Sequence, residues 1–202
     1  MVMRKGKPAI AQDFGVRPRN WSDKPAFLAI DPGDVHVGLA EFTRIEGVWY
    51  CTWAGEKTPD EFLEWYVQGL RMSRWVYVVI ESWKLFPQAA PIYVGSDMPT
   101  SRLIGAIRSL ARFIPIDSGW FDEPMPTHLQ DPQIKIPTRG VLKRRKLRSV
   151  AKILGVPLDH ASDAELHGYK FLIDQKELIN NVNQQNEYWA ETRDLSGRHS
   201  IW

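Results

Sequence analysis

The sequence predicts an α/β fold in which flanking helices cover a mixed sheet. Apolar, β-branched runs typical of buried strands alternate with segments in which apolar residues recur at helical spacing. The predicted order is three strands, a helix, a strand, a helix, a short strand and further helices. This order indicates that the first three strands are antiparallel and that the later strands join through helical crossovers.

Four strands are predicted in the first part of the chain. They cover Phe27–Asp31, Val37–Thr43, Val48–Ala54 and Trp75–Glu81. The second and third form a hairpin across residues 45–47. All four contain β-branched or aromatic residues, which is typical of strands.

Helix signals follow the third and fourth strands. Thr58-Pro59-Asp60-Glu61 is a capping box with proline at the first helical position, which predicts a helix to about Gln68. Residues 100–114 place six apolar residues on one helical face. A short strand could begin at residues 113–116, and the proline-rich residues 118–137 are expected to be irregular.

Two further helical segments are predicted near the end. Residues 139–152 carry seven basic and no acidic residues beside a partial apolar face, and Gly155 followed by Pro157 ends this helix. A last helix should run from about His160 to Ile173.

Composition divides the chain into three regions. Residues 1–24 are expected to form a flexible basic arm, for which contact with DNA is the alternative. Residues 25–174 are the predicted folded domain, and residues 175–202 a polar tail rich in Asn and Gln.

Bulk properties restrict the class of protein. The 202 residues suit one domain with extensions, and the net charge of +2 does not by itself indicate a polyanionic partner. The single Cys51 excludes an internal disulfide and fits a reducing compartment. No apolar stretch approaches the ~20 residues that cross a bilayer, so we expect a cytoplasmic protein with no membrane partner.

Carboxylates stand where buried elements begin or end. Asp31 and Glu81 each close an apolar strand, and a charge there is costly to bury without a partner. His160 and Asp163 are three residues apart at the start of the last helix, so they share a helical face. Oxygen ligands from several elements are what Mg²⁺ requires, and carboxylate clusters of this kind support two-metal phosphodiester chemistry.

Each of these residues also has an ordinary structural explanation. Asp31 could open the Asp-Pro-Gly turn, Glu81 could be a solvated strand end, and Asp163 could be a first-turn acid. Asp159 competes with His160 as a ligand, although we expect it to be the helix N-cap. Their joint occurrence in this order favours the metal site.

The motifs resemble one known family. Ile30-Asp31-Pro32-Gly33 followed by Gly38, the strand ending in Ile80-Glu81, and His160-Ala161-Ser162-Asp163-Ala164 are similar to the RuvC family of Holliday junction resolvases, in the ribonuclease H-like superfamily. The resemblance covers roughly residues 25–173. The arm, the tail and the long loop after Glu81 depart from the bacterial pattern, and the small size is similar to bacteriophage versions, which act in the host cytoplasm.

The resemblance implies a ribonuclease H-like mixed sheet, a homodimer and cleavage of branched DNA. It implies two Mg²⁺ or Mn²⁺ ions per active site and maps four catalytic metal ligands onto Asp31, Glu81, His160 and Asp163. His36 and His167 are near these positions in the sequence pattern, but neither is assigned as a ligand.

A cluster of basic residues precedes the last helix and is predicted to bind DNA. It would neutralise backbone phosphates, and a solvated helix face is the alternative. Trp83 and Phe86 could wedge against bases at a branch point, or simply pack. The predicted DNA-binding residues are Arg139, Lys143, Arg144, Arg145, Lys146, Arg148 and Lys152.

Two other functions remain open from the sequence. An actin-like or sugar-kinase-like ATP-binding protein shares the core topology, but the chain is short for a second domain and has no second glycine-rich phosphate loop. A non-catalytic DNA-binding module with a degenerate site is the other, and the intact acidic positions speak against it. ATP-binding and cleavage assays discriminate among the three.

Overall fold

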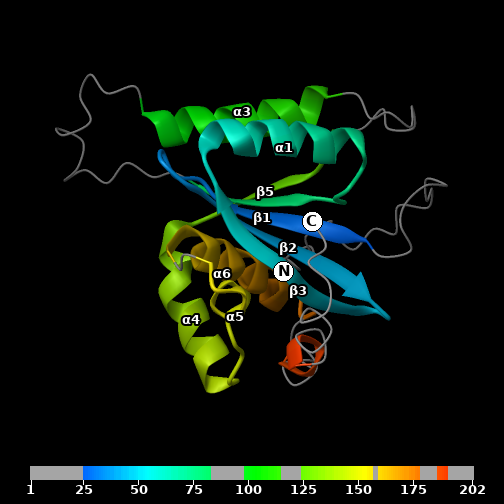
Figure 1. Cartoon of the computed structure of the whole chain (residues 1–202), viewed down its shortest axis with the longest axis vertical. Helices are drawn as coiled ribbons and strands as arrows, with labels where there is room; N and C mark the ends of the chain where they lie inside the picture. Colours follow the sequence, from blue (N-terminus) through cyan, green and yellow to red (C-terminus); the bar gives the residue numbers. More distant parts are fainter. Residues whose placement is uncertain (1–24, 83–97, 115–123, 157–158, 178–185, 191–202) are drawn as a thin grey trace, which may run out of the picture.

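The structure is a computed structural model that describes residues 25–82, 98–114, 124–156, 159–177 and 186–190. A five-stranded sheet lies between two helical layers, with α1 and α3 on one side and α4, α5 and α6 on the other (Figure 1). The predicted arm at residues 1–24, and Trp83 and Phe86, lie outside the described residues.

The sheet is mixed, as predicted. Its strands are β1 (Ala26–Asp31), β2 (Val37–Ile45), β3 (Val48–Lys57), β4 (Val78–Glu81) and β5 (Thr127–Gln130). The strand order is β3-β2-β1-β4-β5. β1, β2 and β3 pair antiparallel, whereas β4 runs parallel to β1 and β5 parallel to β4. The α/β mixed-sheet prediction is therefore confirmed.

The α-helices that flank the sheet are α1 (Pro59–Arg71), α3 (Pro99–Phe113), α4 (Lys135–Arg144), α5 (Val150–Leu154) and α6 (Asp159–Asp174). The predicted capping box of α1 is confirmed. The Glu61 amide donates to the Thr58 hydroxyl at 3.5 Å, and the Thr58 amide donates to Glu61 Oε2 at 3.0 Å. These two bonds satisfy backbone donors that a helix start leaves without partners.

Alternate residues of the central strands serve two separate cores. Leu28 and Ile30 pack toward the α1–α3 layer, whereas Phe27 and Ala29 pack toward α6. Because side chains alternate along a strand, both faces must be apolar, which explains the continuous apolar runs. Gly168 of α6 lies so close to the sheet that a Cβ atom there would meet the Phe42 ring at 2.0 Å.

The described short strand lies outside the range predicted for one. α3 continues to Phe113 and Ile114 follows it as C-cap, so no strand begins at these two residues, and residues 115–116 lie outside the described part of the chain. The described short strand is β5, within residues expected to be irregular. β5 has only four residues and flanking prolines, so its local pattern is weak, and its hydrogen bonds to β4 define it.

The basic segment forms two helices rather than the single helix predicted. α4 ends at Arg144, Lys146 takes a left-handed φ of 57°, and α5 restarts with Ser149 as N-cap. The cause is a distant contact, because the buried Glu165 carboxylate accepts hydrogen bonds from Ser149 and from the first amides of α5. Gly155 ends α5 with a φ of 71°, as predicted.

Part of the predicted tail packs on the domain. Residues 186–190 are helical, and the indole N–H of Trp189 donates to the Cys51 carbonyl of β3 at 2.9 Å. The described part of the chain contains no helix with the length and apolar character of a membrane span.

Candidate metal centre

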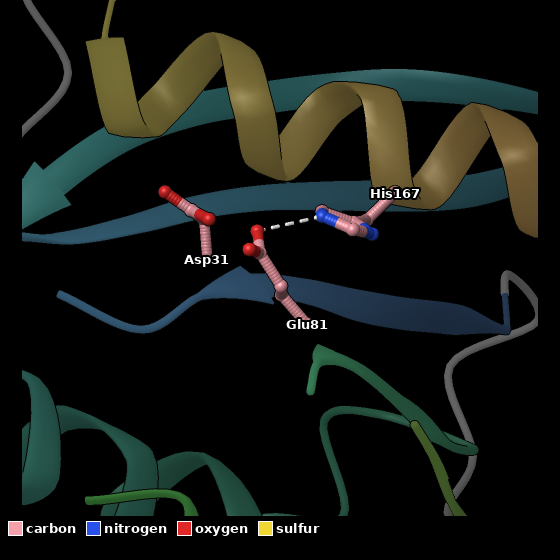
Figure 2. A group of neighbouring side chains, drawn as sticks. All are labelled: Asp31, Glu81 and His167. Atoms are coloured by element: carbon pink, nitrogen blue, oxygen red, sulfur yellow. Dashed lines mark hydrogen bonds and ion pairs between the residues drawn. The ribbon is translucent and has the colours of Figure 1, made fainter. Parts of the chain in front are cut away.

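Asp31 and Glu81 lie side by side because they end neighbouring parallel strands. Ile30 pairs with Ile80 in the register of β1 and β4, so the next residue of each strand is the acid. Asp31 continues the strand face of Phe27 and Ala29, and Glu81 that of Val79, which is the face covered by α6. Strand alternation thus directs both carboxylates under α6 (Figure 2).

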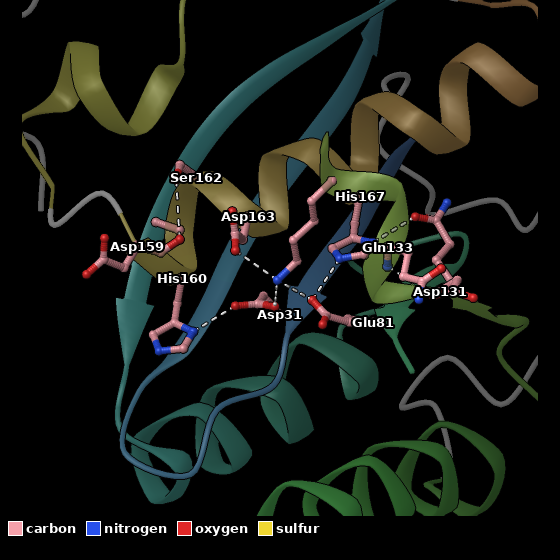
Figure 3. Close-up of polar contacts among 12 residues, drawn as sticks. Asp31, Glu81, Asp131, Gln133, Asp159, His160, Ser162, Asp163 and His167 are labelled. Atoms are coloured by element: carbon pink, nitrogen blue, oxygen red, sulfur yellow. Dashed lines mark hydrogen bonds and ion pairs between the residues drawn. The ribbon is translucent and has the colours of Figure 1, made fainter. Parts of the chain in front are cut away.

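α6 supplies three more polar side chains to the same place. His160, Asp163 and His167 follow one another at three- and four-residue steps, which places them on one helical face toward Asp31 and Glu81 (Figure 3). The side chains of this site therefore come from β1, β4 and α6.

Two features hold the start of α6 against the sheet. Gly38 of β2 leaves room for it, because a Cβ atom there would meet the His160 carbonyl oxygen at 2.0 Å. Glu56 Oε1, at the end of β3, accepts the amides of His160 and Ala161 at 3.0 and 3.1 Å. Asp159 is the first residue of α6, so its predicted role as N-cap is wrong and Glu56 performs that function.

A lysine ammonium lies among the carboxylates. Lys135 Nζ is 2.9 Å from Asp31 Oδ1, 2.6 Å from Glu81 Oε2 and 2.8 Å from Asp163 Oδ2. Lys135 is the first residue of α4, in a region that the sequence pattern left irregular. Sequence reasoning missed it, because a single lysine among many has no distinguishing spacing.

The pKa values of the two strand-end acids are shifted in opposite directions. Burial raises the pKa of Asp31 to about 7, the neighbouring Glu81 adds to this, and Lys135 opposes it. Burial also acts to raise the pKa of Glu81, but hydrogen bonds with His167, Asp31 and Lys135 outweigh it and lower that pKa to about 2. Two close carboxylates resist ionising together, so Asp31 is the one that holds a proton more readily.

Lys135 is correspondingly held in its charged form. Burial alone would lower its pKa, but the carboxylates of Asp31, Asp163 and Glu81 outweigh burial and raise it above its ordinary value. The cluster therefore stabilises a positive charge at its centre.

His167 belongs to this cluster although the sequence reading did not assign it. It is fully buried, its Nε2 lies 2.8 Å from Glu81 Oε2, and its Nδ1 lies 2.9 Å from Gln130 Oε1 of β5. One ligand atom from each of Asp31, Glu81 and His167 lies within 4.8 Å of the others, which is close enough to share an ion. Its four-residue step from Asp163 was a usable sequence signal.

His160 lies beside the cluster and contacts one of its members. Its Nδ1 is 2.7 Å from Asp31 Oδ2, the oxygen that does not meet Lys135. All four predicted ligands therefore gather at one site, with Asp31, Glu81 and Asp163 around a common point and His160 against the outer oxygen of Asp31.

The residues present fit a divalent cation. Mg²⁺ and Mn²⁺ prefer oxygen ligands, and three carboxylates from three different elements already surround one cationic group. Side-chain exposure is 6% for Asp31, 16% for Glu81 and 24% for Asp163, so the site is sheltered but open to solvent on the Asp163 side.

The basic residues extend away from this centre. Arg139 Nη2 contacts Asp163 Oδ1 at 3.1 Å, and the Arg139 side chain is 65% exposed. The remaining members follow along α4, the turn after it and α5, and most are exposed: Lys143, Arg144, Arg145, Lys146, Arg148 and Lys152. The segment thus leads from the carboxylates onto the surface.

No protein-family model and no curated protein sequence matches the chain. Among solved structures, it is similar to the Fowlpox virus resolvase complexed with Holliday junction DNA, with 12% identity and a TM-score of 0.50 over 74% of this chain and 98% of that one. T. thermophilus RuvC in complex with a Holliday junction gives 16% identity and a TM-score of 0.48 over 75% and 96%. The yeast mitochondrial Holliday junction resolvase Ydc2 has 12% identity and a TM-score of 0.47, over 80% of this chain and 83% of that one. The chain has the ribonuclease H-like fold found in such resolvases.

Proposed function

We propose that this chain is a divalent-metal-dependent endonuclease that cleaves branched DNA such as Holliday junctions. One observation carries the proposal: carboxylates that end two adjacent strands and one from α6 converge on a single cationic group. The likeness in fold to the Fowlpox virus resolvase supports the same reading.

Asp31, Glu81, Asp163 and His160 are the proposed ligands and catalytic residues. Asp31 is suited to bridge two ions, since its two oxygens face different partners. When bound, two Mg²⁺ or Mn²⁺ ions would activate water and neutralise charge on the scissile phosphate. His167 orients Glu81 through its Nε2, and the hydrogen bond between its Nδ1 and Gln130 keeps the imidazole in place.

The basic segment is the proposed DNA contact. Its residues from Arg139 to Lys152 present positive charge next to the carboxylates, so a phosphate backbone lying along α4 and α5 would reach the metal centre. Because a symmetric junction needs paired cuts, we also propose a homodimer.

The two terminal regions are proposed to have the roles that the sequence predicts. We propose that residues 1–24 form a basic arm, that residues 175–202 form a polar tail around the helical segment at 186–190, and that the protein acts in the cytoplasm, which is that of the host if the chain comes from a bacteriophage.

A substrate panel tests the proposal. The protein is incubated with linear duplex, flap, three-way and four-way DNA, with Mg²⁺, with Mn²⁺ and with a chelator. We expect metal-dependent cuts in the branched substrates and little cleavage of linear duplex. Gel shifts on the same substrates and a separate ATP-binding assay complete the test. Junction binding without any cutting would favour the non-catalytic module, and ATP binding without DNA binding would favour the ATP-binding class.

A further inference from the structure

We infer that Lys135 is a built-in competitor for the metal centre: its ammonium group and a divalent cation bind to the same three carboxylate oxygens and exclude one another. This inference rests on the proposed function, since it concerns how that site is loaded. Lys135 would thereby control the affinity of the site for metal, because its position at the start of α4 places its ammonium group among the carboxylates.

The ammonium group is fully used by the cluster. A lysine ammonium has three N–H donors, and Nζ contacts three oxygens, one each from β1, β4 and α6, at 2.6–2.9 Å. Mg²⁺ holds its oxygens at about 2.0–2.1 Å. The same oxygens would have to close around the metal, so no room is left for Nζ between them.

Lys135 stabilises the metal-free protein through its positive charge. Three carboxylates that are at most a quarter exposed would repel one another strongly without a cation. Lys135 neutralises part of that charge in the metal-free protein. A divalent ion neutralises more, so each cation makes the other unnecessary.

The lysine is also able to leave. Its side chain is 20% exposed, whereas His167 beneath the cluster is fully buried. Lysine has a flexible four-carbon stem and a strongly hydrated ammonium, so the head group can move into solvent without unfolding α4. Metal binding then costs the loss of three ion pairs, which weakens the apparent affinity.

Calorimetric titration with Mn²⁺ alone tests the inference, with no DNA present. Lys135→Met removes the ammonium and keeps an unbranched side chain. Lys135→Arg keeps the charge. Lys143→Met removes the same unit charge from an exposed position on the same helix, two turns further on, and is the matched control.

We expect Lys135→Met to bind Mn²⁺ on the order of ten- to a hundredfold more tightly than the wild type, because one positive charge leaves the ligand oxygens. Lys135→Arg should stay weak and Lys143→Met should resemble the wild type. Without metal, Lys135→Met should melt at a lower temperature, and Mn²⁺ should raise its melting temperature more than that of the wild type. If the methionine variant does not fold without metal, Lys135→Gln refolded with Mn²⁺ provides the same comparison.

The failure of this inference is distinguishable from the failure of the proposed function. A wild type that binds Mn²⁺ as tightly as Lys135→Met, or more tightly, would overturn the competition and leave the metal site standing. If Lys143→Met gained as much Mn²⁺ affinity as Lys135→Met, the gain would come from the net charge of the protein, and the competition by Lys135 would also be overturned. Absence of Mn²⁺ binding in every variant would overturn the metal site and, with it, the proposed function.

Discussion

His160 Nδ1 lies 2.7 Å from Asp31 Oδ2, although the two residues are 129 positions apart in the chain. The other oxygen of Asp31 meets Lys135 at 2.9 Å. Asp31 is thus oriented by a histidine on one side and faces the cation centre on the other. His160, itself a proposed ligand, thus also orients Asp31, and groups that orient a ligand in this way commonly change metal affinity or activity 10–100-fold when removed.

His160 should therefore be required for cleavage. We predict that His160→Ala lowers the rate of junction cleavage by about 10–100-fold, and that His160→Asp retains activity because a carboxylate can also bind a cation. Asp159→Asn is the control, because Asp159 makes no described contact with Asp31, Glu81 or Asp163. Single-turnover cleavage of a four-way junction measures all three. If Asp159→Asn lost activity while His160→Ala stayed fully active, Asp159 rather than His160 would be the ligand.

Glu56 should stabilise the start of α6. Glu56→Ala removes the acceptor of two helix amides, and we predict a loss of about 1–2 kcal/mol in the free energy of unfolding. Glu64→Ala, at an exposed position of α1, should change it by about 0.5 kcal/mol or less. Urea denaturation measures both variants. Equal effects would show that the capping contact contributes little.

Glu165 should make stability depend on pH. Burial raises its pKa to about 7, despite hydrogen bonds from Ala151, Val150 and Ser149 that favour the carboxylate, while its ordinary value is 4.5. The folded chain therefore holds this proton more tightly than the unfolded chain. The resulting stabilisation is fully present below about pH 4.5 and is lost as the pH rises through about 7.

Denaturation of wild type and Glu165→Gln across that range measures this effect. We predict that the free energy of unfolding of the wild type falls by up to about 3 kcal/mol relative to the variant, at about 1.4 kcal/mol per pKa unit. Parallel pH curves for the two proteins would contradict the prediction.

The basic segment should set the salt dependence of DNA binding. We predict that replacing Arg144, Arg145 and Lys146 by alanine weakens junction binding and lowers the log–log salt slope by about 0.9 per lost phosphate contact. Arg108→Ala with Arg112→Ala is the control, because both residues are exposed on α3, in the helical layer on the opposite side of the sheet (Figure 1). Equal slopes for wild type and the triple variant would place the DNA elsewhere.

The parts of the site that the sequence predicts are those that depend on local patterns. Asp31 and Glu81 are visible because apolar strands end abruptly in a charge, and β1 and β4 then bring them together. His160 and Asp163 are visible from their helical spacing, and His167 continues that spacing one turn further.

The remaining features depend on contacts between distant segments. Lys135 reaches the carboxylates from a proline-rich region without periodicity, and β5 is defined by its pairing with β4. The break between α4 and α5 follows from Glu165, which no local pattern in residues 139–152 reveals. The capping of α6 by Glu56 spans 104 positions and is equally invisible in sequence.

The most direct test of the metal-centre proposal is cleavage of a four-way junction by Asp31→Asn, with Mg²⁺ present and junction binding measured on the same sample. Asparagine keeps the shape of Asp31 but removes its charge at the point where β1, β4 and α6 meet. We predict that cleavage is abolished while binding stays close to that of the wild type, because the proposed phosphate contacts lie along α4 and α5. Cleavage by Asp31→Asn at the wild-type rate would contradict the assignment of this centre as the nuclease site.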